Sequence, residues 1–215
     1  MTPLPRCVIF DLDGTLLDSI PGIEFSARVA FAAAGLSAEG LDLRCRIGPP
    51  IRAILGAAAG TRDPALLDRL EQGFRASYDS EGWQRTVCFP GAEPMLSRLR
   101  AAGHRLFVAS NKPGLISRRI LEAHGLAGCF DEVVTRDSVQ PPHGSKAAIL
   151  SAILSRHSLL AADCVMVGDT MEDAEAAAHH GLGFIFMAHG YGELTPTQPV
   201  LLRLDSFREL PENLP

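Results

Sequence analysis

The sequence contains very little lysine: of its 20 basic residues, only Lys112 and Lys146 are lysines, and the rest are arginines. A chain that otherwise uses arginine can keep lysine where a compact ammonium group is required. Positive charge is not in excess either, because 25 acidic residues give a net charge of −5. We therefore expect no nucleic-acid partner and no binding to an anionic membrane surface.

Long apolar runs are also missing. No stretch reaches the roughly 20 apolar residues of a membrane-spanning helix, and the N-terminus has no pattern typical of a signal peptide. The five cysteines are scattered and form no Cys-x-x-Cys pair. We interpret them as reduced thiols, which predicts a cytoplasmic protein.

The apolar runs that do occur have the length of single strands. Segments of helical character, bounded by glycine or proline, lie between the later ones. This alternation predicts an α/β fold with a Rossmann-like parallel sheet and helices on both faces. The tail after Thr195 has no regular pattern. The expected strands are Cys7–Phe10, Arg105–Ser110, Glu132–Thr135, Cys164–Gly168 and Gly183–Met187.

One segment after the first strand has a different pattern. Residues 20–84 are rich in alanine, leucine and arginine, with helical periodicity in Glu24–Ala34 and Ala65–Tyr78. Asp63 is an expected N-cap for the second helix. The pattern predicts a small all-helical insertion at residues 18–84, placed within a core formed by residues 1–17 and 85–215.

The first strand leads directly into two carboxylates, Asp11 and Asp13. Ligands bind at the carboxyl ends of strands in parallel sheets, and residues two apart share one side of an extended chain. Two carboxylates so close repel each other, so the pair requires a cation or a shared proton. Gly14 permits a sharp turn next to a ligand.

This acidic segment is compatible with other kinds of site. An EF-hand loop is excluded, because Leu16 and Gly22 occupy the positions that require glycine and glutamate. A metal-binding Asp-x-Asp of a glycosyltransferase and a plain acidic turn after a strand stay open on this segment alone.

Further polar residues follow the other strands. Ser110 and Asn111 end one strand, Asp169 follows another, and Asp173 lies four residues later. Lys146 stands at an expected helix start. A carboxylate nucleophile, a hydroxyl, a lysine and a second acidic pair are the groups required for phosphoryl transfer through an aspartate.

These motifs resemble those of the haloacid dehalogenase superfamily, in the same order and with similar spacing. Phe10–Asp18 resembles its first motif, Ser110–Lys112 its second, Lys146 its third and Gly168–Asp173 its fourth. The helical insertion is similar to the cap of phosphoglycolate-phosphatase-like members. An acid at Asp13 separates the chain from true dehalogenases.

The resemblance implies a role for each residue. Asp11 would attack phosphorus and bind Mg²⁺, and Asp13 would act as general acid and base, with its backbone carbonyl also on the metal. Ser110 and Lys146 would hold the phosphoryl group. Asp169 would complete the metal site, and Asp173, also part of that site, would support it from behind the ligands. Expected substrate-binding residues are Gly14, Thr15, Ser110 and Asn111, with Arg46 and Arg52 of the cap, which flank the loop Gly48–Pro50.

The implied function is a Mg²⁺-dependent phosphatase that acts on a small, phosphoglycolate-like phosphorylated metabolite, as a monomer or homodimer. A phosphomutase on the same fold is one alternative. A phospho-accepting signalling domain is another, although the order of its acidic residues differs. A phosphonate hydrolase with a cap lysine is disfavoured, because residues 20–84 contain no lysine.

Overall fold

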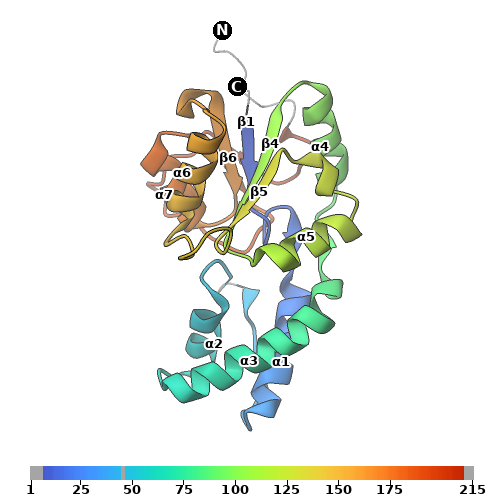
Figure 1. The fold of residues 1–215 in the computed structure, drawn as a ribbon, viewed down its shortest axis with the longest axis vertical. Helices are drawn as coiled ribbons and strands as arrows, with labels where there is room; N and C mark the ends of the chain where they lie inside the picture. The colour runs from blue at the N-terminus through green and yellow to red at the C-terminus, as the bar shows by residue number, and fades with distance from the viewer. Residues whose placement is uncertain (1–6, 45–46, 211–215) are drawn as a thin grey trace.

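The computed structural model describes residues 7–44 and 47–210. Its centre is a six-stranded parallel sheet with the strand order β5-β4-β1-β6-β7-β8 (Figure 1). The five predicted strands are confirmed. The strands are β1 (Cys7–Phe10), β4 (Arg105–Ser110), β5 (Glu132–Thr135), β6 (Cys164–Gly168), β7 (Gly183–Met187) and β8 (Leu202–Leu204).

Each face of the sheet carries its own hydrophobic core. Along β1, Val8 and Phe10 belong to one core, whereas Cys7 and Ile9 belong to the other. The helices α4 and α5 cover the first face, and α6 and α7 cover the second. This arrangement confirms the predicted α/β class. The bounds are α4 (Ala92–Ala101), α5 (Gly114–Ala123), α6 (Lys146–Arg156) and α7 (Met171–His180), with short 3₁₀ turns η2 (Gly82–Arg85), η3 (Ala127–Cys129) and η4 (Ala161–Asp163).

The tail after Thr195 is more ordered than its sequence predicts. It contains β8, which extends the sheet beside β7. Leu204 is buried there, together with Phe207 and Leu210. The expectation of an irregular tail was therefore wrong, since three residues with little strand periodicity of their own pair with an existing sheet edge.

Three helices form a separate layer at one end of the sheet (Figure 1). They are α1 (Ile20–Ala33), α2 (Ile51–Ala59) and α3 (Pro64–Ser80). Asp63 caps α3 as expected, because its side chain accepts a hydrogen bond from the backbone N–H of Ala65. The chain enters and leaves this layer through a two-stranded antiparallel ribbon of β2 (Leu17–Asp18) and β3 (Val87–Cys88). None of the helices in the described residues is long and apolar enough to cross a membrane.

The strand order determines where the polar residues meet. The segments after β1, β4 and β6 leave the sheet at adjacent positions, because these three strands are neighbours and parallel. The backbone N–H of Asp11 still donates to the carbonyl of Val167, at 3.0 Å. The chain order reverses at β1, which is the place where open parallel sheets bind ligands.

Candidate active site

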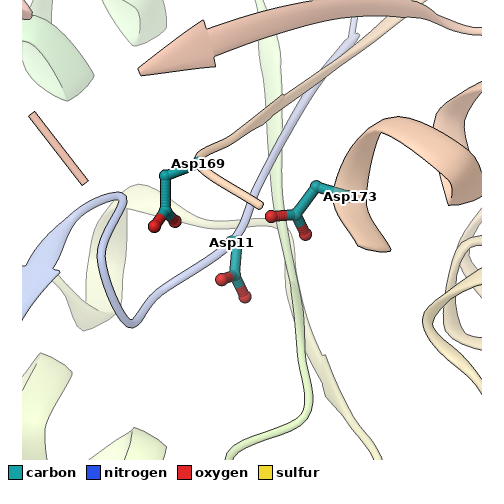
Figure 2. Close-up of side chains that lie close together, drawn as sticks. All are labelled: Asp11, Asp169 and Asp173. Carbon is teal, nitrogen blue, oxygen red and sulfur yellow. The ribbon is translucent and has the colours of Figure 1, made fainter. Parts of the chain in front are cut away.

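Three aspartates from two strand ends meet at this edge. Asp11 follows β1, Asp169 follows β6, and Asp173 lies in the first turn of α7. Figure 2 shows the three side chains converging, and one carboxylate oxygen from each lies within 4.8 Å of the others. All three side chains are buried. The predicted convergence of these residues is present in the structure.

Lys146 supplies positive charge to this cluster. Its Nζ lies 2.8 Å from Asp11 Oδ1 and 2.5 Å from Asp173 Oδ1. Ser145 places the lysine in the first turn of α6, because the serine side chain accepts from the N–H of Ala148 as an N-cap. Burial opposes the charge on Lys146, but Asp11 and Asp173 outweigh it, so its pKa lies above the usual value.

One lysine does not balance three buried carboxylates. Burial raises the pKa of Asp11 to about 8; Lys146 lowers it, and the charges of Asp173 and Asp169 raise it. Burial, with the charge of Asp173, raises the pKa of Asp169 to about 7. Both shifts favour the protonated acids, so a further cation is needed to keep both residues ionised at neutral pH.

Asp169 is held by two loops. The hydroxyl of Thr15 donates to its Oδ1 at 2.7 Å, and the N–H of Tyr191 donates to its Oδ2 at 2.8 Å. Gly14 has a φ of +88°, and a Cβ at this position would overlap the Asp169 carboxylate. Neither Gly14 nor Thr15 lines the cavity described below. In this geometry they support Asp169, and their contact with substrate stays a prediction.

Asp173 combines two tasks. With Thr170 it forms a capping box, in which its Oδ2 accepts from the N–H and hydroxyl of Thr170. Its Oδ1 accepts from Lys146. The acid therefore fixes the start of α7 and orients the lysine beside Asp11.

Asp13 lies apart from the three clustered carboxylates. The Nζ of Lys112 lies 3.0 and 3.2 Å from its two oxygens, and the Ser19 hydroxyl also donates to it. The same Nζ donates to the hydroxyl of Tyr78, on α3, at 2.7 Å. Burial opposes the charge on Lys112, but Asp13 and Tyr78 raise its pKa above the usual value. A hydrogen-bonded chain thus connects Asp13 to the helical layer.

A cavity of about 560 Å³ lies between the sheet edge and the helical layer. Asp11, Asp13, Ser110, Asn111 and Lys146 all line it, so it joins the predicted nucleophile, acid–base residue and phosphoryl-binding groups. Asn111 donates from Nδ2 to the carbonyl of Gly48 and to Glu172. Its buried Oδ1 has no partner among the described residues.

Comparisons with known proteins agree with this arrangement. The family model for haloacid dehalogenase-like hydrolases matches residues 5–181. The chain belongs to this family.

The curated relatives include a phosphatase and a kinase. The phosphoglycolate phosphatase of Nitrosospira multiformis is 32% identical over 198 residues, which cover 89% of this chain and 87% of that protein. The tyrosine-protein kinase PtkA of Mycobacterium tuberculosis is 39% identical over 189 residues, or 87% of this chain and 64% of the kinase. The chain therefore spans less than two thirds of the kinase's length.

A solved structure extends the likeness to the whole fold. The predicted phosphatase from Clostridium acetobutylicum has a TM-score of 0.87 and 27% identity, with 98% of both chains covered. Together with the family match and the curated phosphatases, it supports a phosphatase.

The structure describes one of the two arginines that were predicted to bind substrate. Arg46 lies outside the described residues. Arg52 is not among the residues that line the cavity. Its guanidinium instead lies 2.6 Å from Asp68 and 3.3 Å from Glu71, which ties α2 to α3. Arg75, on α3, is an arginine that does line the cavity.

The donor set of this hydrolase fits a hard divalent cation. Asp11, Asp169 and Asp173 offer only oxygen ligands, which suit Mg²⁺ better than zinc. The raised pKa values of Asp11 and Asp169 also fit a cation site, because a cation between the carboxylates would remove their mutual repulsion. The side chain of Asp13 is absent from this cluster of described residues, and the expected metal contact of its carbonyl stays a prediction.

Sequence reasoning missed Lys112 and Tyr78 as site residues. The scarcity of lysine was the available signal, since both lysines of the hydrolase are buried in the site. Tyr78 has no such signal, because its position in α3 resembles that of any helical core residue.

Proposed function

We propose that the protein is a Mg²⁺-dependent phosphatase that hydrolyses a small phosphorylated metabolite through an aspartyl-phosphate on Asp11. The observation that carries the proposal is the position of Asp11 in the cavity, with its carboxylate 2.8 Å from Lys146 and beside Asp169 and Asp173. A bound Mg²⁺ would supply charge for the phosphate oxygens and for these carboxylates.

The residues divide the reaction into two displacements. In the first, an Asp11 oxygen attacks phosphorus while the bond to the leaving oxygen breaks, and protonated Asp13 gives its proton to the leaving alcohol. In the second, Asp13 takes a proton from water, the water oxygen attacks phosphorus, and the bond to Asp11 breaks. Ser110, Asn111 and Lys146 hold the phosphoryl oxygens in both steps.

Phosphoglycolate is the first substrate to test, because curated relatives about one-third identical are phosphoglycolate phosphatases. The similarity to a tyrosine-protein kinase favours a second candidate, transfer of the phosphoryl group to a tyrosine hydroxyl. Phosphate release from monoesters supports the first function. Phosphotyrosine formed from a nucleotide donor, without such release, supports the second.

The nucleophile is tested with Asp11→Asn in a phosphate-release assay with Mg²⁺ and a panel of monoesters. We expect turnover to fall at least about 1,000-fold, because the amide cannot form the intermediate. Asp68→Asn is the matched control, since Asp68 is exposed, pairs with Arg52 and does not line the cavity. An Asp11→Asn variant with a tenth of wild-type activity would rule out the covalent route.

A further inference from the structure

The cavity beside Asp11 has an apolar section that the two displacements do not use. Besides the polar groups of the sheet edge, side chains from α1, α2, α3, α5 and the loop before α2 line it. They are Ile23, Ile47, Ile51, Ile54, Phe74 and Ile116. Four of the six, at positions 23, 54, 74 and 116, are buried. These side chains surround whatever is attached to the phosphoryl group.

The face of α3 shows where this apolar section lies. Glu71, Phe74, Arg75, Tyr78 and Asp79 line the cavity with the spacing of one helical face. Tyr78 lies at the end of this face that is nearest the reacting groups, because its hydroxyl accepts a hydrogen bond from Lys112. Glu71 lies two turns earlier, about 10 Å along the helix axis. Phe74 lies between them on the same face of the helix.

The cavity keeps its volume although the helical layer already contacts the core. Asn111 Nδ2 bonds to the carbonyl of Gly48 at 3.2 Å, and Arg119 bonds to the carbonyl of Asp79 at 3.2 Å. The Tyr78 hydroxyl is bonded to Lys112 as well. A space of about 560 Å³ remains, within the roughly 300–1,000 Å³ typical of pockets for larger organic ligands. A two-carbon hydroxy acid would leave most of it unfilled.

The charges in the lining do not favour a short carboxylate. In the described part of the cap, the lining contains one cation, Arg75, and it lies 3.7 Å from Glu71. Asp79 adds a second acid on the same face. On the core side Arg136 is accompanied by Asp137. Acids therefore line the cavity beside its arginines on both sides, Glu71 and Asp79 on α3 and Asp137 on the core side.

We propose that the leaving group is an alcohol with an extended apolar body, an alkyl or aryl chain of about four carbons or more, and not a short carboxylate-bearing alcohol. This inference rests on the proposed phosphatase function and narrows its substrate class. The phosphoryl group would lie beside Asp11, and the apolar body would lie against Phe74 and the isoleucines.

A homologous series of ethyl, butyl, hexyl and octyl phosphate tests the proposal. These esters have leaving alcohols of nearly equal acidity, so differences in kcat/KM report on binding of the chain. We expect kcat/KM to rise about threefold to fourfold per methylene group until the section is filled, as the transfer of a methylene from water predicts. Phosphoglycolate should fall below butyl phosphate.

Two variants test whether the apolar section of the cavity causes the dependence of kcat/KM on chain length. Ile51→Asn changes a partly exposed side chain of the lining and should flatten the rise of kcat/KM with chain length. Val29→Asn is the control, because Val29 is 42% exposed on α1 and does not line the cavity. A flat series in the wild type, with phosphoglycolate the best substrate, would overturn the proposal.

A binding measurement separates this inference from the proposed function. Alkylphosphonates of the same chain lengths are not hydrolysed, so their affinity can be measured by thermal shift without turnover. Rising affinity with chain length supports the apolar section even if no monoester releases phosphate, in which case only the phosphatase proposal fails. Equal affinity for all chain lengths contradicts the apolar section, whatever the activity.

Discussion

The two lysines have separate partners at the reacting centre. Lys146 contacts Asp11 and Asp173, and Lys112 contacts Asp13 and Tyr78. Burial alone would favour neutral amines, but the neighbouring groups raise both pKa values above the usual range. Each predicted catalytic carboxylate therefore has its own fixed positive charge, and the two carboxylates are held in different positions.

The Lys112→Met variant tests whether this second ion pair positions Asp13. We expect kcat to fall roughly tenfold to a hundredfold, at or below the low end of the roughly 100-fold to 10,000-fold that an acid–base group itself contributes, because Asp13 remains in place. KM should change less, because the phosphoryl-binding residues remain. Lys112→Arg, which keeps the charge, should recover part of the loss. Steady-state kinetics on one monoester measure both values, and a kcat equal to wild type in Lys112→Met would exclude a positioning role.

At the scale of elements, the turn after β1 depends on close packing against the loop after β6. Gly14 adopts a left-handed φ of +88° directly beside Asp169, and Thr15 donates to that carboxylate. A side chain at position 14 would meet both backbone strain and steric overlap. The two acidic segments can approach each other only because this position is a glycine.

The Gly14→Ala variant should be destabilised and should bind Mg²⁺ less well. We expect the free energy of unfolding to fall by about 1–3 kcal/mol, because the alanine is strained and displaces Asp169. Gly128→Ala is the control, since its φ is not in the left-handed range and the space that its Cβ would enter is open; it should stay within about 0.5 kcal/mol of wild type. Urea denaturation measures the free energy of unfolding of both variants. Equal stability of the two variants would contradict the packing argument.

At the scale of the whole molecule, the fold concentrates acidic groups in a chain with a net charge of −5. The buried carboxylates of Asp11, Asp169 and Asp173 come from segments more than 150 residues apart, which the parallel sheet brings to one edge. Their mutual repulsion lowers stability when all are ionised. Binding of a cation at this cluster would therefore be coupled to folding.

Mg²⁺ should raise Tm, and the increase should be larger at pH 8 than at pH 5. Without metal, the pKa values of Asp11 and Asp169 are about 8 and 7, above the ordinary 3.8. The folded state then binds more protons than the unfolded state, so stability falls as pH rises from about 4 to 8. Mg²⁺ offsets this loss where the acids are ionised and competes with protons where they are not.

Thermal denaturation with and without Mg²⁺ measures this response. At about 100 times its dissociation constant, the ion should contribute roughly 2.7 kcal/mol. Asp169→Ala should remove most of the increase in Tm, whereas the exposed Asp68→Asn should keep it. An equal increase in Tm at both pH values would contradict the linkage.

The sequence alone was sufficient for five of the six strands of the sheet and for the main chemical groups. Buried parallel strands are short, continuous apolar runs, so all five predicted strands match the structure. Asp11, Ser110, Lys146 and Asp169 end strands, follow them or begin helices, and parallel strands deliver such residues to one edge. Local pattern and general topology therefore determined the convergence that Figure 2 shows for the aspartates.

Only the tertiary structure decided which groups pair. Lys112 with Asp13 and Tyr78, Arg52 with Asp68, and β8 beside β7 all join segments that have no local signal for each other. The pairing of Asp11 with one lysine and of Asp13 with the other was also decided by the tertiary structure, because it depends on where α3 and α6 lie against the sheet. Such contacts are set by packing between distant segments, which the periodicity of a single segment does not encode.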